Sequence, residues 1–389
     1  MSVSYSITGG TVHLSGNPIE VKITSSGSAG RSNYKLALKI TCSALMGSPF
    51  VEEIAPVNLV STFDISGFAD QPVDYSFDYP TIGAVNPHDL LAFHVSLDIG
   101  EIWNDTNGDR QETWSNLDPA DNTIRILKGK LFAYELAILN ETVKSFASEY
   151  INGGRFLTHL PDYQRVSPSH NPILWYLSRW TDSHDITLNL KVNTNNKVAH
   201  LPMTQNHTIY DITGLVEFAF QPLFWGFDLD PGELIESYEF WITDANGDIS
   251  EHRTYLVDNN YYEQTFTFYY VNPLSGIDLI WLTGEYSFGL KTESETAIRP
   301  VAVGSGTRVA TLRTISSSAQ RSWEINTGPK SRKEMLSLRD FLIARQCWMV
   351  DPDDPSSLIP VIIESGDSIL YDSKEDIQNI SIKLLEAHQ

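Results

Sequence analysis

The sequence has little cysteine. Only Cys42 and Cys347 occur among 389 residues, and they lie far apart. A disulfide framework or a zinc site needs more cysteines at closer spacing, so the sequence supports neither. We expect two buried free thiols in a protein made in a reducing compartment.

Positive charge is also scarce. The chain carries 27 Lys and Arg against 49 Asp and Glu, a net charge of −22. Nucleic-acid binding depends on clustered Lys and Arg that displace counterions, and anionic membranes attract basic segments. We therefore expect neither nucleic acid nor an anionic membrane as a partner, whereas cations and basic proteins would be attracted.

Long hydrophobic runs are missing as well. No stretch approaches the roughly 18 apolar residues of a membrane-spanning helix, so no membrane insertion is expected. Met1–Ser6 has neither the basic region nor the apolar segment of a secretory signal. We expect synthesis in a host cytoplasm without a signal peptide, and release by another route such as lysis.

The common catalytic motifs are absent. The chain has no G-x-S-x-G elbow, no H-E-x-x-H, no P-loop and no dinucleotide fingerprint. We therefore expect a protein that binds and assembles and is not an enzyme. A glycosidase needs only two carboxylates about 5–10 Å apart, and the 49 acidic residues leave that alternative open.

Four short patterns occur twice, in the same order. The first set is Asn17–Ile19, Leu36–Ile40, Phe63–Gly67 and Asp105–Asp109, and the second is Asn171–Ile173, Leu188–Val192, Tyr210–Gly214 and Asp244–Asp248. The spacing between the copies shrinks along the chain, as expected when the second copy has shorter loops. This period is much longer than the ~20–50 residues of solenoid repeats and indicates two tandem domains.

The repeated unit has the pattern of β-structure. Apolar and polar residues alternate in Tyr34–Thr41 and in Ile186–Val192, as in strands with one buried face. Asn107-Gly108 and Asn246-Gly247 favour hairpin turns, because type I′ turns need positive φ. Short strands separated by turns predict two β-sandwiches of immunoglobulin or fibronectin-III type.

The C-terminal third has a different pattern. Ser331–Glu334 is a capping box that predicts a helix to about Arg345, and Lys291–Gly306 is a polar loop or an exposed hairpin. Strands are predicted at Cys347–Val350, Leu358–Glu364 and Ile377–Leu385. The resulting fold class is mainly β: two tandem, internally duplicated β-sandwiches followed by an α+β module.

These patterns also give a domain division. We expect a first sandwich over 1–135, a helix or linker over 136–160, a second sandwich over 161–262 and an α+β assembly module over 263–389.

The first D-x-N-G-D pattern raises the question of calcium. Asp105, Asn107 and Asp109 place oxygen ligands at positions 1, 3 and 5 of a calcium loop. Arg110 and Asn116 stand where such a loop needs glycine and an acid. A hairpin turn is therefore favoured over calcium, and no other cofactor is expected.

Two further clusters could bind partners. Trp175 and Trp180 could stack on sugar rings, although tryptophan more often supplies packing area. Arg332, Lys333 and Arg339 form a basic patch in an acidic protein. That patch is either a solvated helix face or a docking surface for an acidic neighbour, such as another copy of this chain.

The C-terminal part resembles a known group of proteins. The residues that carry the resemblance are the runs Tyr269–Gly284, Trp323–Gly328 and Leu358–Ile363. They resemble structural proteins encoded in the tail-gene regions of tailed bacteriophages and prophages of Bacteroidetes-type bacteria. The resemblance implies a virion component at the tail tip, baseplate or fibre attachment, and it transfers no catalytic residue.

The partners expected from this resemblance are further copies of the chain, in a symmetric homo-oligomer, and other virion tail proteins. The alternative function is that of a receptor- or carbohydrate-binding β-sandwich protein that contacts a host surface glycan or receptor.

Overall fold

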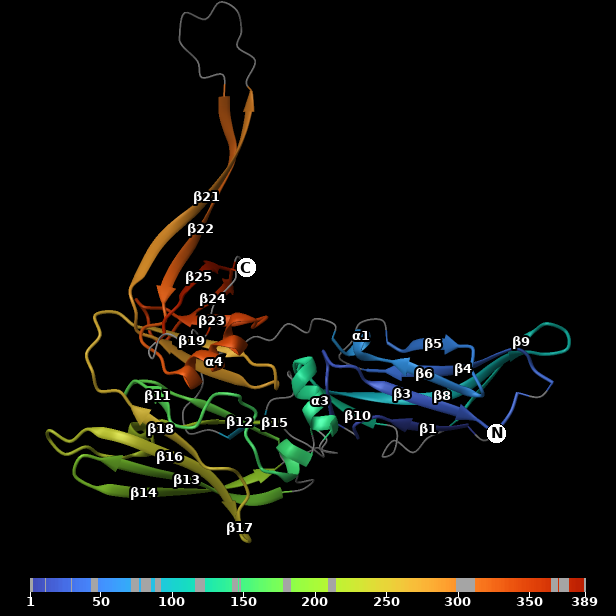
Figure 1. The fold of residues 1–389 in the computed structure, drawn as a ribbon, viewed down its shortest axis with the longest axis horizontal. Coiled ribbons are helices and arrows are strands. Elements are labelled where there is room, and N and C mark those ends of the chain that lie inside the picture. The colour runs from blue at the N-terminus through green and yellow to red at the C-terminus, as the bar shows by residue number, and fades with distance from the viewer. Residues whose placement is uncertain are drawn as a thin grey trace, which may run out of the picture. The chain divides into compact units, whose positions relative to one another are not determined.

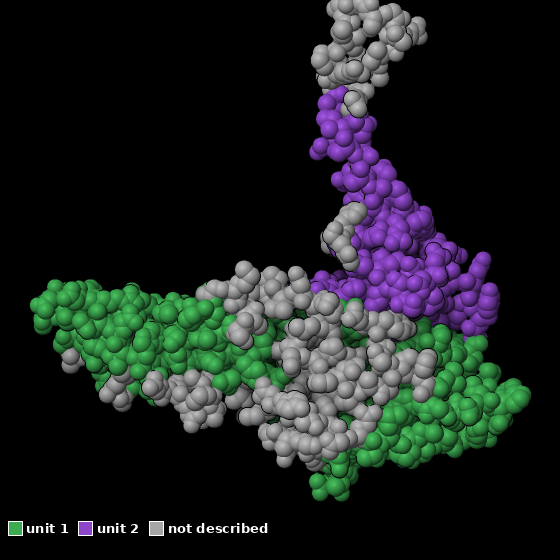
Figure 2. Space-filling model, turned by 180° about the vertical axis from the view of Figure 1, so that it is seen from behind, with its two compact units in different colours: residues 1–259, 272–278 green, residues 260–271, 279–389 purple. Residues whose placement is uncertain are grey.

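The computed structural model describes residues 3–10, 12–28, 30–42, 48–70, 77, 85–87, 92–115, 123–141, 146, 148–177, 183–208, 215–298, 312–364, 370 and 378–387. The chain divides into two compact units (Figure 2). Unit 1 comprises Met1–Asn259 and Asn272–Asp278, and unit 2 comprises Asn260–Val271 and Leu279–Gln389.

The N-terminal part of unit 1 is a β-sandwich. Its smaller sheet has the order β1 (Val3–Ile7), β3 (Glu20–Ser25), β6 (Val60–Asp64). Its larger sheet has the order β2 (Val12–Leu14), β10 (Thr123–Leu127), β8 (Ala92–Asn104), β4 (Ser32–Thr41), β5 (Phe50–Ile54), with β9 (Arg110–Trp114) paired to β8. The short helix α1 (Ser66–Ala69) follows β6. On β4, Leu36, Leu38 and Ile40 are buried, as the alternation predicts.

A second sandwich follows in unit 1. Its larger sheet has the order β11 (Gln164–Val166), β18 (Arg253–Val257), β16 (Ile235–Asp244), β13 (Ser183–Thr194), β14 (Val198–Thr208), with β17 (Gly247–Asp248) paired to β16. Its smaller sheet has the order β12 (Ile173–Leu177), β15 (Leu215–Ala219), β7 (Val85–Pro87). A 3-10 helix, η2 (Pro222–Trp225), follows β15.

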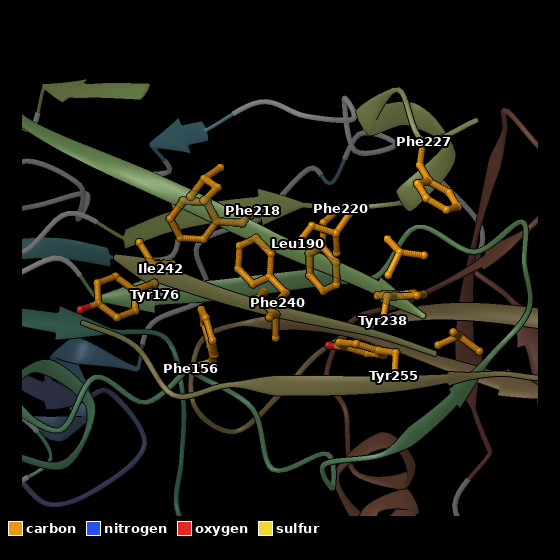
Figure 3. Close-up of a cluster of buried hydrophobic side chains, with 14 of the residues drawn as sticks. Phe156, Tyr176, Leu190, Phe218, Phe220, Phe227, Tyr238, Phe240, Ile242 and Tyr255 are labelled. Carbon is orange, nitrogen blue, oxygen red and sulfur yellow. The ribbon is translucent and has the colours of Figure 1, made fainter. Parts of the chain in front are cut away.

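Aromatic side chains fill the core of the second sandwich (Figure 3). Phe240 is fully buried and stacks on Phe220, with ring centroids 4.6 Å apart. Tyr176, Phe218 and Tyr238 extend the same cluster. Each buried aromatic pair of this kind contributes about 0.5–1.5 kcal/mol beyond its area burial, so this core is a main source of stability in unit 1.

The two larger sheets share one strand order. Each starts with a short strand that runs parallel to its neighbour, β2 beside β10 and β11 beside β18. In each, the remaining strands are antiparallel and a side strand pairs with the central β8 or β16. Two sheets with this pairing are typical of immunoglobulin-like sandwiches. The predicted fold class of duplicated sandwiches is confirmed.

Short helical segments connect the sandwiches. The helix α3 spans Ala133–Glu141, and the π-helical turn η1 spans Ser148–Asn152. Both segments overlap the range 136–160, in which a helix or linker was expected. No helix among the described residues is long and apolar enough to cross a membrane.

Unit 2 is an α+β module. Its seven-stranded sheet has the order β20 (Ile277–Leu282), β19 (Phe266–Val271), β23 (Cys347–Val350), β24 (Leu358–Ile363), β25 (Ser381–Glu386), β22 (Leu312–Asn326), β21 (Tyr286–Ile298). The helix α4 (Arg332–Leu342) has the predicted capping box, in which the Ser331 and Glu334 side chains each accept the other's backbone N–H. Met335, Leu338 and Phe341 pack into the core of the sheet.

Candidate functional site

The three residues considered for calcium form a hairpin turn between β8 and β9. Asp105 Oδ1 accepts the backbone N–H groups of Asn107 (2.8 Å) and Asp109 (2.9 Å), and Oδ2 accepts from the Gln111 amide (3.2 Å). The Asp105 carboxylate is thus occupied in closing the turn. Across the part of the chain that the structure describes, no group of three or more His, Cys, Asp and Glu side chains is arranged to hold a metal.

The tryptophan considered for sugar stacking is a core residue. Trp175 on β12 is only 1% exposed, and its Nε1 donates to the Ile277 carbonyl at 3.1 Å. Its ring therefore offers no face to a sugar, which corrects the ligand-binding interpretation of this residue. Trp180 lies outside the described residues.

A half-buried tryptophan of the second sandwich stacks on two histidines. Trp241 on β16 stacks on the imidazoles of His200 and His252, at centroid distances of 5.3 and 4.6 Å. His252 in turn contacts Glu239 and Asp248. The indole is engaged by two imidazole rings of its own chain, so this stack does not leave an open platform for a sugar.

The residues of the basic patch differ in exposure. Arg332 and Lys333 are exposed in the first turn of α4. Arg339 is paired with Asp340, Nη2 to Oδ1 at 3.0 Å. Leu336, on the same helix, is 48% exposed. The exposed side of α4 is therefore mixed, with two cationic groups beside an apolar one.

A long hairpin is the most distinctive surface of unit 2. The strands β21 and β22 pair antiparallel from Tyr286 opposite Ile325 to Ile298 opposite Leu312. The strand β25 pairs with β22 only over Ser322–Asn326. Beyond that point the two strands continue as a ribbon with no third strand in the described sheet (Figure 1). We call the paired residues Tyr286–Ile298 and Leu312–Asn326 the arm.

The base of the arm carries an apolar stripe. Tyr286, Phe288 and Leu290 follow every second position of β21 and therefore share one face. Their exposed fractions are 49%, 57% and 58%. Phe288 packs on the buried Trp323 at 5.7 Å between centroids. The stripe thus extends the buried core of unit 2 to an edge strand, where nothing among the described residues of unit 2 buries it.

Polar side chains lock the same face of the arm to the sheet. Arg321 forms two hydrogen bonds to the Glu386 carboxylate, at 2.7 and 2.8 Å. Its guanidinium also lies 5.6 Å from the centroid of Trp323. A bidentate pair of this kind fixes the orientation of the two side chains and is stronger than a single hydrogen bond. It therefore fixes the base of β22 against β25.

The outer part of the arm is a bare ribbon. The residues Thr292–Thr296 on β21 and Thr314–Ala319 on β22 are all exposed. In the space-filling view this part stands clear of the other described atoms of unit 2 (Figure 2). An isolated two-stranded hairpin is marginal in water, because fixing each residue's backbone costs about 1–2 kcal/mol. The described residues of unit 2 therefore give this part of the ribbon little support.

The two faces of the arm differ in chemistry. Strand alternation places Glu293, Glu295 and Glu324 on the face opposite the apolar stripe, together with Lys291. Beyond Ser322, neither strand of the ribbon pairs with a third strand among the described residues, and such edges are the usual template for pairing with another strand. Within the described part of unit 2, the arm thus offers an apolar stripe, an acidic face and open strand edges.

The sequence predicted this site only in part. Lys291–Gly306 was expected to be a loop or an exposed hairpin, and its N-terminal portion belongs to β21. The stripe of Tyr286, Phe288 and Leu290 was missed, although its alternation is visible in the sequence. Such alternation ordinarily indicates burial, and the sequence contains no signal that this strand lies at an edge.

The buried acid Glu101 of the first sandwich is fully engaged. Glu101 is 2% exposed and accepts hydrogen bonds from Ser25 (2.9 Å), Tyr34 (2.6 Å) and Arg31 (2.8 Å). Burial raises the pKa of the Glu101 carboxyl, but these three donors outweigh it and hold the pKa below its usual value. A carboxylate with every oxygen occupied stabilises the loop end of the first sandwich.

Comparisons with known proteins give no family. No family model matches the chain, and no curated protein matches it. Among solved structures, the bacterial integrin-binding protein invasin matches at 10% identity and a TM-score of 0.21, over 84% of this chain and 56% of invasin. A marsupial T cell receptor matches at 12% identity and a TM-score of 0.20, over 84% of this chain and 96% of the receptor.

Proposed function

We propose that this chain is a structural protein of a bacteriophage tail, at the tail tip, baseplate or fibre attachment, and that it assembles as a symmetric oligomer without catalysing a reaction. The arm of unit 2 is the observation that supports assembly. A long ribbon gains stability when another surface covers its exposed apolar stripe and the edges that no described strand pairs with. The placement in a phage tail is supported by the resemblance of the C-terminal residues.

The partner of the arm is a second copy of the same chain. Unit 2 carries two patches of opposite charge: the acidic face with Glu293, Glu295 and Glu324, and the start of α4 with Arg332 and Lys333. A contact between two different patches of one chain is heterologous, and it closes into a ring when the rotation allows. Charge complementarity also selects the partner and accelerates the encounter.

A charge exchange tests this contact. Arg332→Glu with Lys333→Glu should weaken assembly, and so should Glu293→Lys with Glu295→Lys, because each pair places like charges across the contact. The chain with all four substitutions should assemble again, since both patches are then reversed together. Sedimentation velocity at low ionic strength measures all three, because screening by salt weakens exposed pairs.

Two outcomes would contradict the proposal. Assembly as strong as that of the wild type in all three variants would show that these charges do not lie at the contact. A wild-type chain that sediments as a monomer at every concentration would argue against self-assembly itself. Glu236→Lys with Glu263→Lys, at two exposed positions outside both patches, is the matched control for the change in net charge of the Glu293 and Glu295 variant.

A further inference from the structure

The loop between β19 and β20 is buried although it belongs to no strand over most of its length. The chain leaves unit 2 after Val271, passes through unit 1 as Asn272–Asp278, and returns to unit 2 at Leu279. All seven loop residues are buried, with Leu274 and Ser275 at 0% exposure. Loops normally run over the surface because their backbone polar groups need partners, so this one needs a special explanation.

The side chain of Asn272 organises the loop. Its Oδ1 accepts the backbone N–H groups of Leu274 (2.9 Å) and Gly276 (3.0 Å). The Asn272 N–H donates to the Gly276 carbonyl at 2.9 Å. Ser275 takes a φ of 74°, in the left-handed region that non-glycine residues rarely adopt. The loop is therefore a compact turn whose conformation needs outside support.

Three segments of unit 1 supply that support. The amide Nδ2 of Asn272 donates to the Leu157 carbonyl at 2.7 Å, and Trp175 Nε1 donates to the Ile277 carbonyl at 3.1 Å. The Lys130 N–H donates to the Pro273 carbonyl at 2.8 Å. Each bond satisfies a group that would be buried and unpaired without it, which makes the seated loop specific.

The fit is too close for a side chain at Gly276. A Cβ there would lie 2.6 Å from the Leu157 carbonyl oxygen. Gly129 makes the same kind of approach from the other side, because its Cβ would lie 2.2 Å from the Pro273 carbonyl oxygen. Both glycines are required by close backbone contact around the loop.

We propose that the Asn272–Asp278 loop couples the folding of unit 2 to the folding of unit 1. The strands β19 and β20 are neighbours in the sheet of unit 2, and this loop is their connection. Their hairpin closes with the loop in its strained turn, and the partners that stabilise this turn all belong to unit 1. Unit 2 therefore reaches its full stability only after unit 1 has folded. This inference does not depend on the proposed function.

Hydrogen exchange of the full-length chain, followed by mass spectrometry, tests the coupling. Trp175→Phe removes the donor to Ile277 while keeping an aromatic ring in the core. Amides of β19 and β20 should then exchange about tenfold faster, as expected for one lost hydrogen bond to a buried carbonyl. Gly276→Ala should accelerate the same amides further. Trp241→Phe, in the outer stack of the same sandwich, should leave them unchanged.

Two results would overturn the proposal. In the first, the amides of β19 and β20 exchange at the wild-type rate in both Trp175→Phe and Gly276→Ala, and only the loop peptides exchange faster. This would show that the loop docks without coupling the two units. Equal acceleration by Trp175→Phe and Trp241→Phe would show a general loss of stability in the sandwich rather than an effect of the loop.

Discussion

At the scale of single residues, several buried carboxylates stabilise the loops and turns around them. Glu233 is an example: its side chain is fully buried, accepts from Thr194 Oγ1 and from the Asp230 N–H (2.9 Å), and pairs with Lys197 at 3.0 Å. The hydrogen bond from Thr194, with those from Asp230 and Lys197, lowers the pKa of Glu233 to about 2. The carboxylate thus holds the turn after β13 to the segment that leads into β16.

This arrangement predicts a pH dependence. An unfolded glutamate has a pKa of about 4.3, so the contribution of Glu233 to stability is present above that pH and is lost as the pH falls towards 2. Glu233→Gln should reduce the urea midpoint of the second sandwich at pH 6, and the difference from wild type should shrink towards pH 2.5. A difference that is the same at both pH values would contradict this, and Glu236→Gln is the control for lost charge.

Residue roles were the hardest to predict from the sequence. The hairpin turn at Asp105 followed from Asn107-Gly108, because turn chemistry is local. For Trp175 the sequence left packing and sugar stacking both open, because its partner Ile277 lies about a hundred positions later in the chain. Single residues whose surroundings come from distant segments cannot be assigned from pattern alone.

At the scale of elements, the arm differs from the other strands because its outer part is exposed and contributes little to the stability of a single chain. Residues 292–319 can be replaced by Asn-Gly, which joins the paired residues Lys291 and Gln320 with a two-residue turn. The melting temperature of the monomer should change by less than about 2 °C, since Thr292–Thr296 and Thr314–Ala319 are exposed. Calorimetry measures this, and a fall of many degrees would show that the arm supports the core.

Elements with strong local signals were predicted well. The capping box at Ser331 and Glu334 gave the start of α4 correctly, and the strands at Cys347–Val350 and Leu358–Ile363 were found. The strand predicted from Ile377 begins at Ser381 in the described part. The pairing of β7 with β15 was not foreseen, because it joins residues more than a hundred positions apart.

At the scale of the whole molecule, the duplicated pattern in the sequence corresponds to two sheets with one strand order. Four short sequence patterns that recur in the same order predicted the duplication, since a shared order of patterns reflects a shared order of strands. Within the described residues, no group of three or more His, Cys, Asp and Glu side chains is arranged to hold a metal. What distinguishes the chain is the arm, and the account of its function depends on whether copies associate through it.

The most direct measurement is therefore light scattering of the wild-type chain and the arm-shortened chain over the same range of concentrations. The account predicts that the wild-type chain forms a defined species at a multiple of 43.7 kDa and that the shortened chain remains a folded monomer. A wild-type chain that stays monomeric throughout, or a shortened chain that assembles as well as wild type, would contradict it.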